Sequence, residues 1–536
     1  MNPDHEHRDR KPSDDSISIA TIESSMSSDS STTDNTSPSA SSRNSLSSRE
    51  QTTDWTSIYV ATSVGFVGAV QYSLYFASLW PYLQTIDPTA SENFFGLIIA
   101  TYSLAQMFAS PIVGTWSNKI RSSVPPLQMG LVLMIVGNMI YFFAPVLPLP
   151  MTKKYVLLIA RAIGGFGSAN VSLLKAYAST ASTGGDRSKA IAYVTGGIAM
   201  GLTMGPAFQL FFTPLGTSGI FIATNVVINT YTAPALAGIA MNVFGMVLVK
   251  KYFVEKHIGV PHKKDMEKYG KLPPYDRVAI SVCYVTRFCQ MFIVTNLESI
   301  GTPLAMTMFA WDRLTVVRNV AVAQALQSFC ALMTYVIYIK FDLGKKINSK
   351  RALYFAIGGF IVFHLVTYSW PFLGGQLVVF NSLDILAANG TELAGCNTDH
   401  FNWCHSLTPV NVWLFYGSYV LVVGVCLSSF NIALNTLFSK IIGPRPQAAQ
   451  QGWLQVSGGA AKFAGPLVIS GLYTEFGPRW AWNIEIVLIV STLVMWLILS
   501  NRMVPLRMPE AFAAYQDPND PDLVKKSKKT KTVVPV

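Results

Sequence analysis

The chain has 536 residues, of which 50% are hydrophobic and 13% are charged. Because a soluble domain is usually about 25% charged, this composition excludes an ordinary water-soluble enzyme and is typical of a protein with many membrane-spanning helices. The net charge of +11 does not indicate nucleic-acid binding, because no basic patch lies on a soluble domain and the cytosolic loops of membrane proteins also collect Lys and Arg.

The first 54 residues are rich in Ser, Thr and Asp and nearly free of large apolar side chains. Such a segment cannot bury enough apolar surface to offset the entropy lost on folding. We therefore expect residues 1–54 to form a disordered cytosolic arm. The apolar run that follows is expected to act as an uncleaved signal anchor.

Twelve apolar segments follow, each close to the roughly 20 residues that cross a bilayer as a helix. We expect spans at 57–80, 94–113, 127–147, 155–178, 190–212, 231–250, 278–308, 316–339, 353–373, 410–437, 453–474 and 481–500. The seventh is the longest, and Gly301 and Pro303 predict that it is tilted or broken.

The two halves of the chain echo each other. Six spans precede the polar stretch 251–277 and six follow it, and Gly205-Pro206 in the fifth span matches Gly465-Pro466 in the eleventh. Duplicated halves are typical of transporters with a cavity at the middle of the membrane. The sequence predicts an all-α membrane protein with twelve transmembrane helices in two pseudo-repeated six-helix lobes. The predicted lobes cover 55–253 and 277–503, with a cytosolic inter-lobe loop at 254–276 and a cytosolic tail at 504–536.

Charges in the short loops predict the orientation of the chain. With the amino terminus in the cytosol, the inner loops hold 19 Lys and Arg and the outer loops hold five. Since positive residues stay on the cytosolic side, both termini are expected to be cytosolic. The outer loop at 372–412 has no Lys or Arg and contains the sequon Asn389-Gly390-Thr391, which predicts a luminal, glycosylated surface.

This luminal loop also holds two cysteines, Cys396 and Cys404. In an oxidising lumen they predict one disulfide. His400 and His405 lie beside them and leave a zinc site open as an alternative, but the spacing matches no standard zinc pattern. We expect no metal and no cofactor.

Ionisable residues inside the spans are the candidates for function, because a charge at membrane depth costs several kcal/mol unless it is paired or hydrated. Arg161 lies in the fourth span, Lys462 lies in the eleventh, and Arg287 precedes Glu298 by 11 residues in the seventh. Eleven residues are about three helical turns, so Arg287 and Glu298 share a face if the helix is continuous.

With Lys175 and Glu485, which lie near enough to span ends to snorkel, the spans hold four basic groups and two acidic ones. An excess of positive charge around a cavity stabilises an anionic solute. The alternative is structural: Arg161 and Glu298 pair with each other, or the heads of Arg287 and Lys462 reach an aqueous margin.

Glu298 is also a candidate proton acceptor that faces an acidic lumen. Burial and a nearby Arg have opposite effects on the proton affinity of its carboxyl group, and the sequence leaves open which effect is larger. Asn431 and Asn435 are four residues apart in the tenth span, so they share a face. With Gln71 and Tyr75 of the first span they are candidates for uncharged contacts in the cavity. Hydrogen bonding between helices is the structural alternative.

The sequence contains no P-loop and no H-E-x-x-H motif, so neither ATP-driven pumping nor zinc proteolysis is indicated. No segment combines a nucleophile, a base and an orienting group, so we do not expect an enzyme. Transport is expected to be passive or driven by a gradient.

Three motifs, in order and in the right spans, resemble the major facilitator superfamily. Residues Gly114 to Lys119 are similar to the superfamily's loop after the second span, which implies a gating role for Gly114, Asn118 and Lys119. The superfamily usually has Asp where Asn118 stands and Gly where Arg121 stands.

The run from Arg161 to Gly167 resembles the fourth-span motif, whose arginine is often linked to substrate or proton handling. Gly197, Gly201 and Gly205-Pro206 resemble the fifth-span motif, in which missing side chains let helices approach and bend. The resemblance and the echo between the halves imply helix-bending roles for Gly201, Gly205, Pro206, Gly465 and Pro466.

Residues 55–503 further resemble a lysosomal branch of the superfamily, through stretches such as Leu79 to Gln84 and Gly443 to Gln447. Glu298 falls at that branch's seventh-span glutamate, and Lys462 stands where the branch has an arginine. The resemblance implies a glycosylated endosomal and lysosomal membrane protein associated with chloride permeation.

Two cytosolic segments indicate partners. Tyr269 to Leu272 fits a tyrosine-based motif for sorting adaptors, and the basic run Lys525 to Lys529 suits anionic membrane lipid. Our interpretation is a transport protein that passes an anionic solute, with chloride favoured, by alternating access or a channel-like leak. The alternatives are a proton-coupled carrier of a small organic anion and a non-transporting lysosomal scaffold or receptor.

Overall fold

The computed structural model describes residues 52–75, 78–88, 90, 92–146, 150–223, 226–261, 266–267, 270–387 and 393–523. Four predicted features lie outside these residues: almost all of the expected N-terminal arm, the glycosylation site Asn389, Tyr269 of the sorting motif, and the basic run Lys525 to Lys529.

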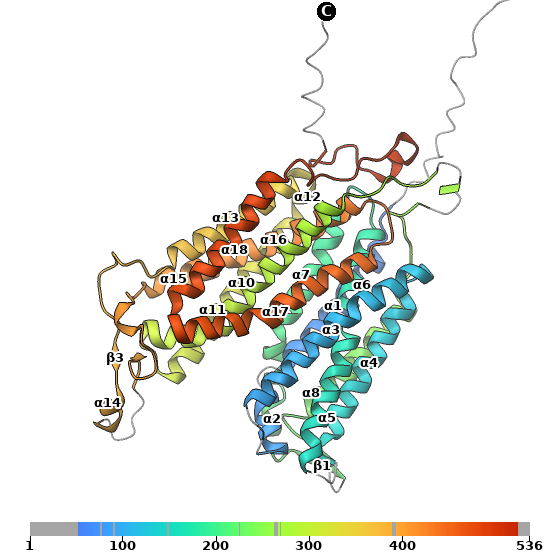
Figure 1. The fold of residues 1–536 in the computed structure, drawn as a ribbon. Coiled ribbons are helices and arrows are strands. Elements are labelled where there is room, and N and C mark those ends of the chain that lie inside the picture. The colour runs from blue at the N-terminus through green and yellow to red at the C-terminus, as the bar shows by residue number, and fades with distance from the viewer. Residues whose placement is uncertain are drawn as a thin grey trace, which may run out of the picture. The chain divides into compact units, whose positions relative to one another are not determined.

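The first half of the described chain is a set of long helices with one small hairpin (Figure 1). Its helices are α1 (Trp55–Leu74), α2 (Leu79–Ile86), α3 (Glu92–Ile120), α4 (Val124–Phe143), α5 (Pro150–Gly167), α6 (Asn170–Thr180), α7 (Arg187–Leu210) and α8 (Ala233–Tyr252). Two antiparallel strands, β1 (Ile220–Ala223) and β2 (Val226–Ile228), lie between α7 and α8.

The second half repeats this helical arrangement and adds a structured loop. Its helices are α10 (Arg277–Phe309), α11 (Arg313–Lys340), α12 (Leu343–Lys346), α13 (Ser349–Val366), α15 (Val412–Ser418), the π-helical turn η4 (Tyr419–Val423), α16 (Gly424–Ile442), α17 (Ala448–Phe476) and α18 (Pro478–Ile498). The loop between α13 and α15 holds α14 (Ser382–Ala387) and the short parallel strands β3 (Val379–Phe380) and β4 (Cys396–Asn397).

Three helices of the second half begin at an Asp or Asn that caps them. The side chain of Asp276 accepts hydrogen bonds from the first amide groups of α10, and Asn348 and Asn411 do the same for α13 and α15. These caps satisfy N–H groups that have no partner inside the helix, so they fix where the seventh, ninth and tenth spans begin.

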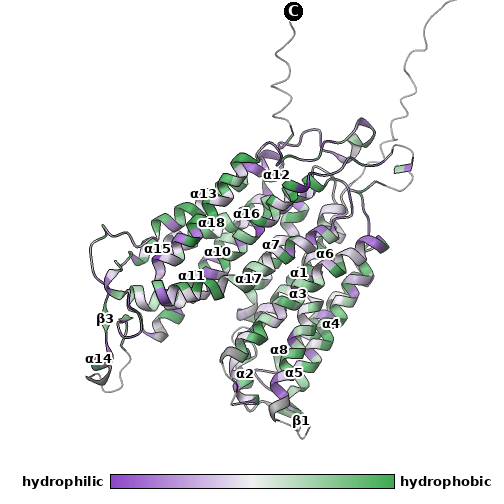
Figure 2. Cartoon of the chain, viewed as in Figure 1, coloured by the Kyte–Doolittle hydropathy of each residue, from purple (hydrophilic) through white to green (hydrophobic). Residues whose placement is uncertain are grey.

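Among the described residues, ten helical segments are long and apolar enough to cross a membrane, and α1 with α2, bent by 51°, makes an eleventh. Apolar residues dominate these long helices in Figure 2. The remaining expected span lies in α17, which is 29 residues long but carries three glutamines and Lys462. It packs against α3 and α10, so part of its surface faces protein rather than lipid. The predicted fold class, an all-α membrane bundle of twelve spans in two six-helix halves, is confirmed.

Of the two alternatives predicted for the seventh span, a tilt or a break, the break at Gly301 and Pro303 is wrong. The helix α10 continues through these residues for 33 residues to Phe309. A proline removes one backbone hydrogen bond, and transmembrane helices tolerate that loss where neighbouring groups satisfy the backbone.

The bundle has two ends, which we name by their features. The tail end carries the connections at 121–123, 181–186, 341–348 and 443–447 and the C-terminal segment 499–523. The disulfide end carries the β1–β2 hairpin and the loop 367–411. Each half has its own apolar core, and two smaller clusters join the halves, one around Ala109 and Ala448 and one around Tyr335 and Ile432.

Candidate functional site

A cavity of about 520 Å³ lies between the two halves. Helices α1, α3, α6 and α7 of the first half and α10, α11, α16 and α17 of the second half contribute to its walls. Four ionisable side chains of the spans line it: Lys175, Arg287, Glu298 and Lys462. The cavity therefore collects three cationic side chains and one acidic side chain.

Arg287 is held in a fixed orientation by two amide side chains. Its Nη1 donates to Oε1 of Gln290 at 2.7 Å and to Oδ1 of Asn431 at 2.8 Å, and Gln290 Nε2 donates to the same Asn431 oxygen at 3.0 Å. We find no hydrogen bond for Nε or Nη2 among the described residues. Gly458 lies against this side chain, since a Cβ there would be 3.2 Å from Arg287 Nε.

Lys175 and Lys462 complete the cationic group. Lys175 is close enough to Arg287 and Lys462 for their charges to act on it, and it is only 9% exposed. Neither lysine head forms an ion pair or a hydrogen bond within the described part of the chain. Snorkelling was the wrong interpretation for Lys175, because it lines the cavity. The signal in the sequence was its distance from the next charged residue, Asp186, which is 11 positions further on.

Glu298 lies on α10 beyond Arg287, toward the disulfide end. The helix is continuous between them, and both side chains line the cavity. Lys462 is the cation whose charge acts on Glu298. Glu298 makes no hydrogen bond or ion pair within the described residues, so its carboxyl group is open to the cavity.

Arg161 does not line this cavity. It borders a separate space of about 20 Å³ with Gln71, Tyr75, Asn138 and other residues of the first half. Its guanidinium carbon lies 4.4 Å from the ring centre of Tyr102 and 5.3 Å from that of Tyr75, and it pairs with no carboxylate among the described residues. The alternative of an Arg161–Glu298 pair is therefore not what the structure contains.

Of the four uncharged candidates, only Asn431 lines the large cavity. Asn435 is buried, and its Nδ2 donates to the backbone oxygen of Asn431 at 2.7 Å. Tyr75 donates to Asn138 at 2.7 Å and Asn138 donates to Gln71 at 2.9 Å. Gln71 and Tyr75 thus take part in hydrogen bonds between helices of their own half, the structural alternative, whereas Asn435 bonds within its own helix α16.

Hydrogen bonds and ion pairs join the two halves on the tail side of the cavity. Asp186 pairs with Lys345 at 3.1 Å and Lys189 with Asp342 at 3.1 Å. The hydroxyl groups of Ser188 and Tyr338 lie 2.5 Å apart.

Two of the three predicted gating residues lie at the α3–α17 contact. Asn118 Oδ1 accepts a hydrogen bond from the backbone N–H of Ala448 at 3.1 Å and so caps the start of α17. A Cβ on Gly114 would lie 2.3 Å from the carbonyl oxygen of Ala448, so only glycine fits. Lys119 is exposed, and no ion pair of it is found in the described chain. Arg121 has a φ of 54°, a conformation that suits the glycine usual at this position.

The electrostatics at the tail end keep Asp186 ionised. Its partial burial would raise the pKa, but hydrogen bonds from Thr53 and Lys345 and the charge of Lys345 outweigh burial and hold the pKa below its ordinary value. The same contact raises the pKa of Lys345. The pair therefore stays charged at neutral pH.

The predicted helix-bending glycines serve close packing in the structure. A Cβ on Gly201 would lie 2.4 Å from the carbonyl oxygen of Phe66 on α1, and one on Gly465 would lie 2.8 Å from Oδ1 of Asn296 on α10. Gly205 packs against Ser73 in the same way. Both α7 and α17 continue through Pro206 and Pro466.

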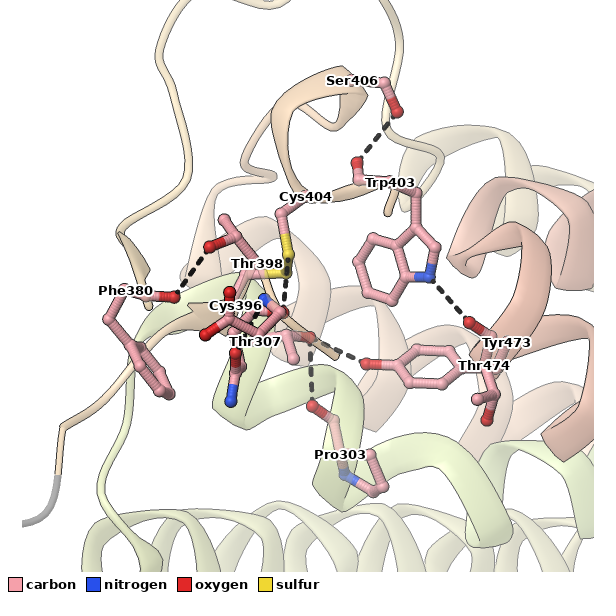
Figure 3. The surroundings of a disulfide bond; sticks show 12 residues. Pro303, Thr307, Phe380, Cys396, Thr398, Trp403, Cys404, Ser406, Tyr473 and Thr474 are labelled. Carbon is pink, nitrogen blue, oxygen red and sulfur yellow. Dashed lines mark hydrogen bonds between the residues drawn. A yellow bond between two sulfur atoms is a disulfide. The ribbon is translucent and has the colours of Figure 1, made fainter. Parts of the chain in front are cut away.

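The structure contains a disulfide between Cys396 and Cys404 (Figure 3). The neighbouring Trp403 donates from Nε1 to the carbonyl oxygen of Thr474 on α17 at 3.3 Å, and the hydroxyl groups of Thr307 and Tyr473 lie 2.8 Å apart below it. The first bond fastens the loop to the end of α17, and the second joins the ends of α10 and α17. The two thiols are not available to zinc, and the described residues contain no group of three or more His, Cys, Asp or Glu that could hold a metal.

One buried pair of hydrogen-bonded side chains lies apart from the cavity, and the sequence did not predict it. His364 Nε2 on α13 and Glu485 Oε2 on α18 are 2.5 Å apart, and His364 Nδ1 lies 2.7 Å from the carbonyl oxygen of Phe360. Both side chains are almost fully buried, so Glu485 does not snorkel. The signal that was available is a histidine in an apolar span, which needs a partner at that depth.

Together these features define a membrane transporter with two six-helix halves around a central cavity. Residues 61–402 match the family model of the Major Facilitator Superfamily. The chain belongs to this superfamily, as the resemblance in the sequence predicted.

Several relatives and solved structures are similar to the chain. Over 477 residues it is 31% identical to Major facilitator superfamily domain-containing protein 8 of Xenopus laevis. The aligned residues make up 84% of this chain and 92% of that protein. A shorter stretch of 145 residues is 31% identical to the chromaffin granule amine transporter of Rattus norvegicus and covers 26% of each chain.

Among solved structures, the human organic anion transporter MFSD10 (TETRAN) aligns with a TM-score of 0.56 and 15% identity, over 82% of this chain and 99% of that one. A bacterial homologue of the iron transporter ferroportin in its outward-facing state aligns with a TM-score of 0.59 and 10% identity, over 83% and 99%. At these identities the likeness supports the fold alone.

Proposed function

We propose that the protein carries an anionic solute across an endosomal or lysosomal membrane by alternating access, with its tail end and both termini in the cytosol. One observation carries the proposal. Lys175, Arg287 and Lys462 line a single cavity, and none of them pairs with a carboxylate among the described residues. Cations that share a low-dielectric cavity repel each other and attract an anion.

The contacts at the tail end support alternating access over a permanent leak. The Asp186–Lys345 and Lys189–Asp342 pairs and the α3–α17 contact close that end. If a cavity is closed at one end, that end must open and the other end must close before a solute can cross the membrane. A leak-like conductance would require both ends to open together.

Chloride is the favoured solute, as the resemblance implies. The alternative solute is a small organic anion whose movement is coupled to protons through Glu298. Glu298 supports coupling because it lines the same cavity and has no fixed partner in the described part of the chain. Proton coupling predicts a flux that depends on a pH gradient and loses that dependence in Glu298→Gln.

The test is anion flux into proteoliposomes that contain the purified full chain, measured for a panel of anions with and without a pH gradient. We expect Lys175→Gln, Arg287→Gln and Lys462→Gln each to reduce flux. Lys340→Gln, which removes an exposed charge at the end of α11, is the matched control and should transport like the unaltered protein.

Saturable exchange would support a carrier, and unsaturable chloride current would point to a channel. Absence of flux for every anion, with correctly folded protein, would overturn the proposal and favour a scaffold or receptor.

A further inference from the structure

A bare inorganic ion would fill only a small part of the cavity. Its volume of about 520 Å³ falls in the range of about 300–1,000 Å³ that is usual for sites of organic ligands. One water molecule takes about 30 Å³ in the liquid, so a single chloride would leave most of the cavity empty of solute. A solute that fills it must have a body as well as a charge.

The walls of the cavity carry both charged and apolar side chains. Lys175 is close enough to Arg287 and Lys462 for their charges to act on it, so the three cationic side chains form one group. Side chains such as Tyr72, Met204, Phe329 and Leu332 supply apolar surface to the same cavity. A ligand that satisfies both parts has one charged end and one apolar end.

Arg287 indicates the chemistry of the charged end. Two amide oxygens occupy Nη1 and fix the plane of the guanidinium. The Nε and Nη2 groups have no hydrogen-bond partner in the described residues. Two neighbouring N–H groups of this kind match the paired oxygens of a carboxylate or a phosphate. A spherical halide cannot bind both groups in this way.

From these observations we infer that the cavity binds an amphiphilic organic oxyanion, with its carboxylate or phosphate on Arg287, Lys175 and Lys462 and its apolar body along Tyr72, Met204 and Phe329. This inference rests on the proposed function and names the solute class of the same cavity. Glu298, on the disulfide side, faces the body of the ligand and disfavours a second negative charge there.

Binding to the purified full chain tests the inference. The probes share one apolar body: 2-naphthoate, 2-naphthyl phosphate, neutral 2-naphthol and a naphthylmethylammonium cation, with acetate and chloride as anions that lack the body. We expect one of the two naphthyl oxyanions to bind at least about ten-fold more tightly than acetate, chloride, the neutral probe and the cation. The carboxylate and the phosphate arms distinguish the two head groups.

Variants assign the two ends of the ligand. Arg287→Lys retains the charge but loses the planar pair of donors, so it should weaken the naphthyl oxyanion about ten-fold or more and chloride much less. Met204→Gln should weaken the naphthyl oxyanion and leave acetate unchanged. Lys340→Gln is the control and should match the unaltered protein.

The result that overturns the inference is saturable chloride or acetate transport that the naphthyl oxyanions do not inhibit. In that case the proposed anion transport would stand and only the solute class would fall. If no anion of any kind binds or moves, the proposed function itself fails.

Discussion

The guanidinium of Arg161 stacks on the ring of Tyr102, and Tyr102 in turn lines the central cavity. The arginine itself does not line the cavity. We propose that Arg161 is a positioning residue that acts through this ring, although the resemblance to the superfamily links the fourth-span arginine to substrate or proton handling.

The stacking predicts an order among variants. Arg161→Gln removes the cation that lies over the ring of Tyr102. We expect a raised KM for transport, by about five- to thirty-fold, since a cation–π contact contributes about 1 kcal/mol at an exposed site and about 2 kcal/mol when it is desolvated. Tyr102→Phe keeps the ring and should stay within about two-fold of the unaltered KM. A Tyr102→Phe variant as impaired as Tyr102→Ala would show that the hydroxyl, and not the stacked ring, is what Arg161 serves.

The ion pair at the tail end predicts how closure depends on pH. Because the pKa of Asp186 is lowered in the folded protein, the pair contributes stability above the carboxyl's ordinary pKa of 3.8 and loses it only as the pH falls through the lowered value. Closure of the tail end should therefore not change between pH 7 and pH 5.

Asp186→Asn should raise the fraction of molecules whose tail end is open at every pH in that range. The increase should be no more than about five-fold, because partly exposed ion pairs contribute at most about 1 kcal/mol. The measurement is the labelling rate of single cysteines placed at the seam between α7 and α12. A labelling rate that rises between pH 7 and pH 5 in the unaltered chain would refute this account.

The buried pair of His364 and Glu485 predicts a large loss of stability for one-sided replacement. Glu485→Leu leaves His364 without its partner at the same depth, and we expect it to lower the free energy of unfolding by about 3–5 kcal/mol. The double variant His364→Leu with Glu485→Leu should recover much of that loss. Thermal unfolding in detergent measures both, and transport by the double variant shows whether the pair has any role in flux.

The C-terminal segment forms a buried ion cluster with Lys440 of α16. Lys440 Nζ lies 2.7 Å from Asp520 and 2.8 Å from Asp522, with the lysine only 7% exposed. Nearby, the backbone nitrogen of Asp517 approaches Gly184 of the first half so closely that a Cβ on Gly184 would lie 2.8 Å from it. The segment thus contacts both halves.

Replacing Asp520 and Asp522 together by Asn should destabilise the chain by about 3–5 kcal/mol, because Lys440 is then left buried without a counter-charge. Limited proteolysis should cut residues 504–523 faster in this variant. Asp384→Asn, a carboxylate in the loop at the opposite end, is the control and should leave the cutting rate unchanged.

The sequence predicted the fold well because the signals are local. Apolar length gave the twelve spans and their division into halves, and the 11-residue interval between Arg287 and Glu298 placed both on one face. The break at Gly301 and Pro303 was wrong because tertiary neighbours decide whether a proline interrupts a transmembrane helix.

The site was harder to predict because side-chain partners come from different helices. Arg161 and Arg287 look alike in the sequence, yet one stacks under Tyr102 and the other faces the cavity beside Asn431. Lys175 was expected to be near enough to a span end to snorkel, but it is buried and lines the cavity. The His364–Glu485 pair joins residues 121 positions apart, which no single-chain spacing rule finds.

At the α3–α17 contact, Gly114 and Gly452 bring main chain against main chain, and a Cβ on either would lie within 2.6 Å of the opposite backbone. Side-chain bonds also cross this contact, from the backbone of Ala448 to Asn118 and between Gln455 and Gln106, so separating the surfaces breaks both the close backbone packing and these bonds. A single methyl group at either glycine would push the two helices apart. Alanine there should bias a folded population toward the conformer whose solute chamber faces the other compartment, which makes these two positions a simple means of trapping that conformer for study.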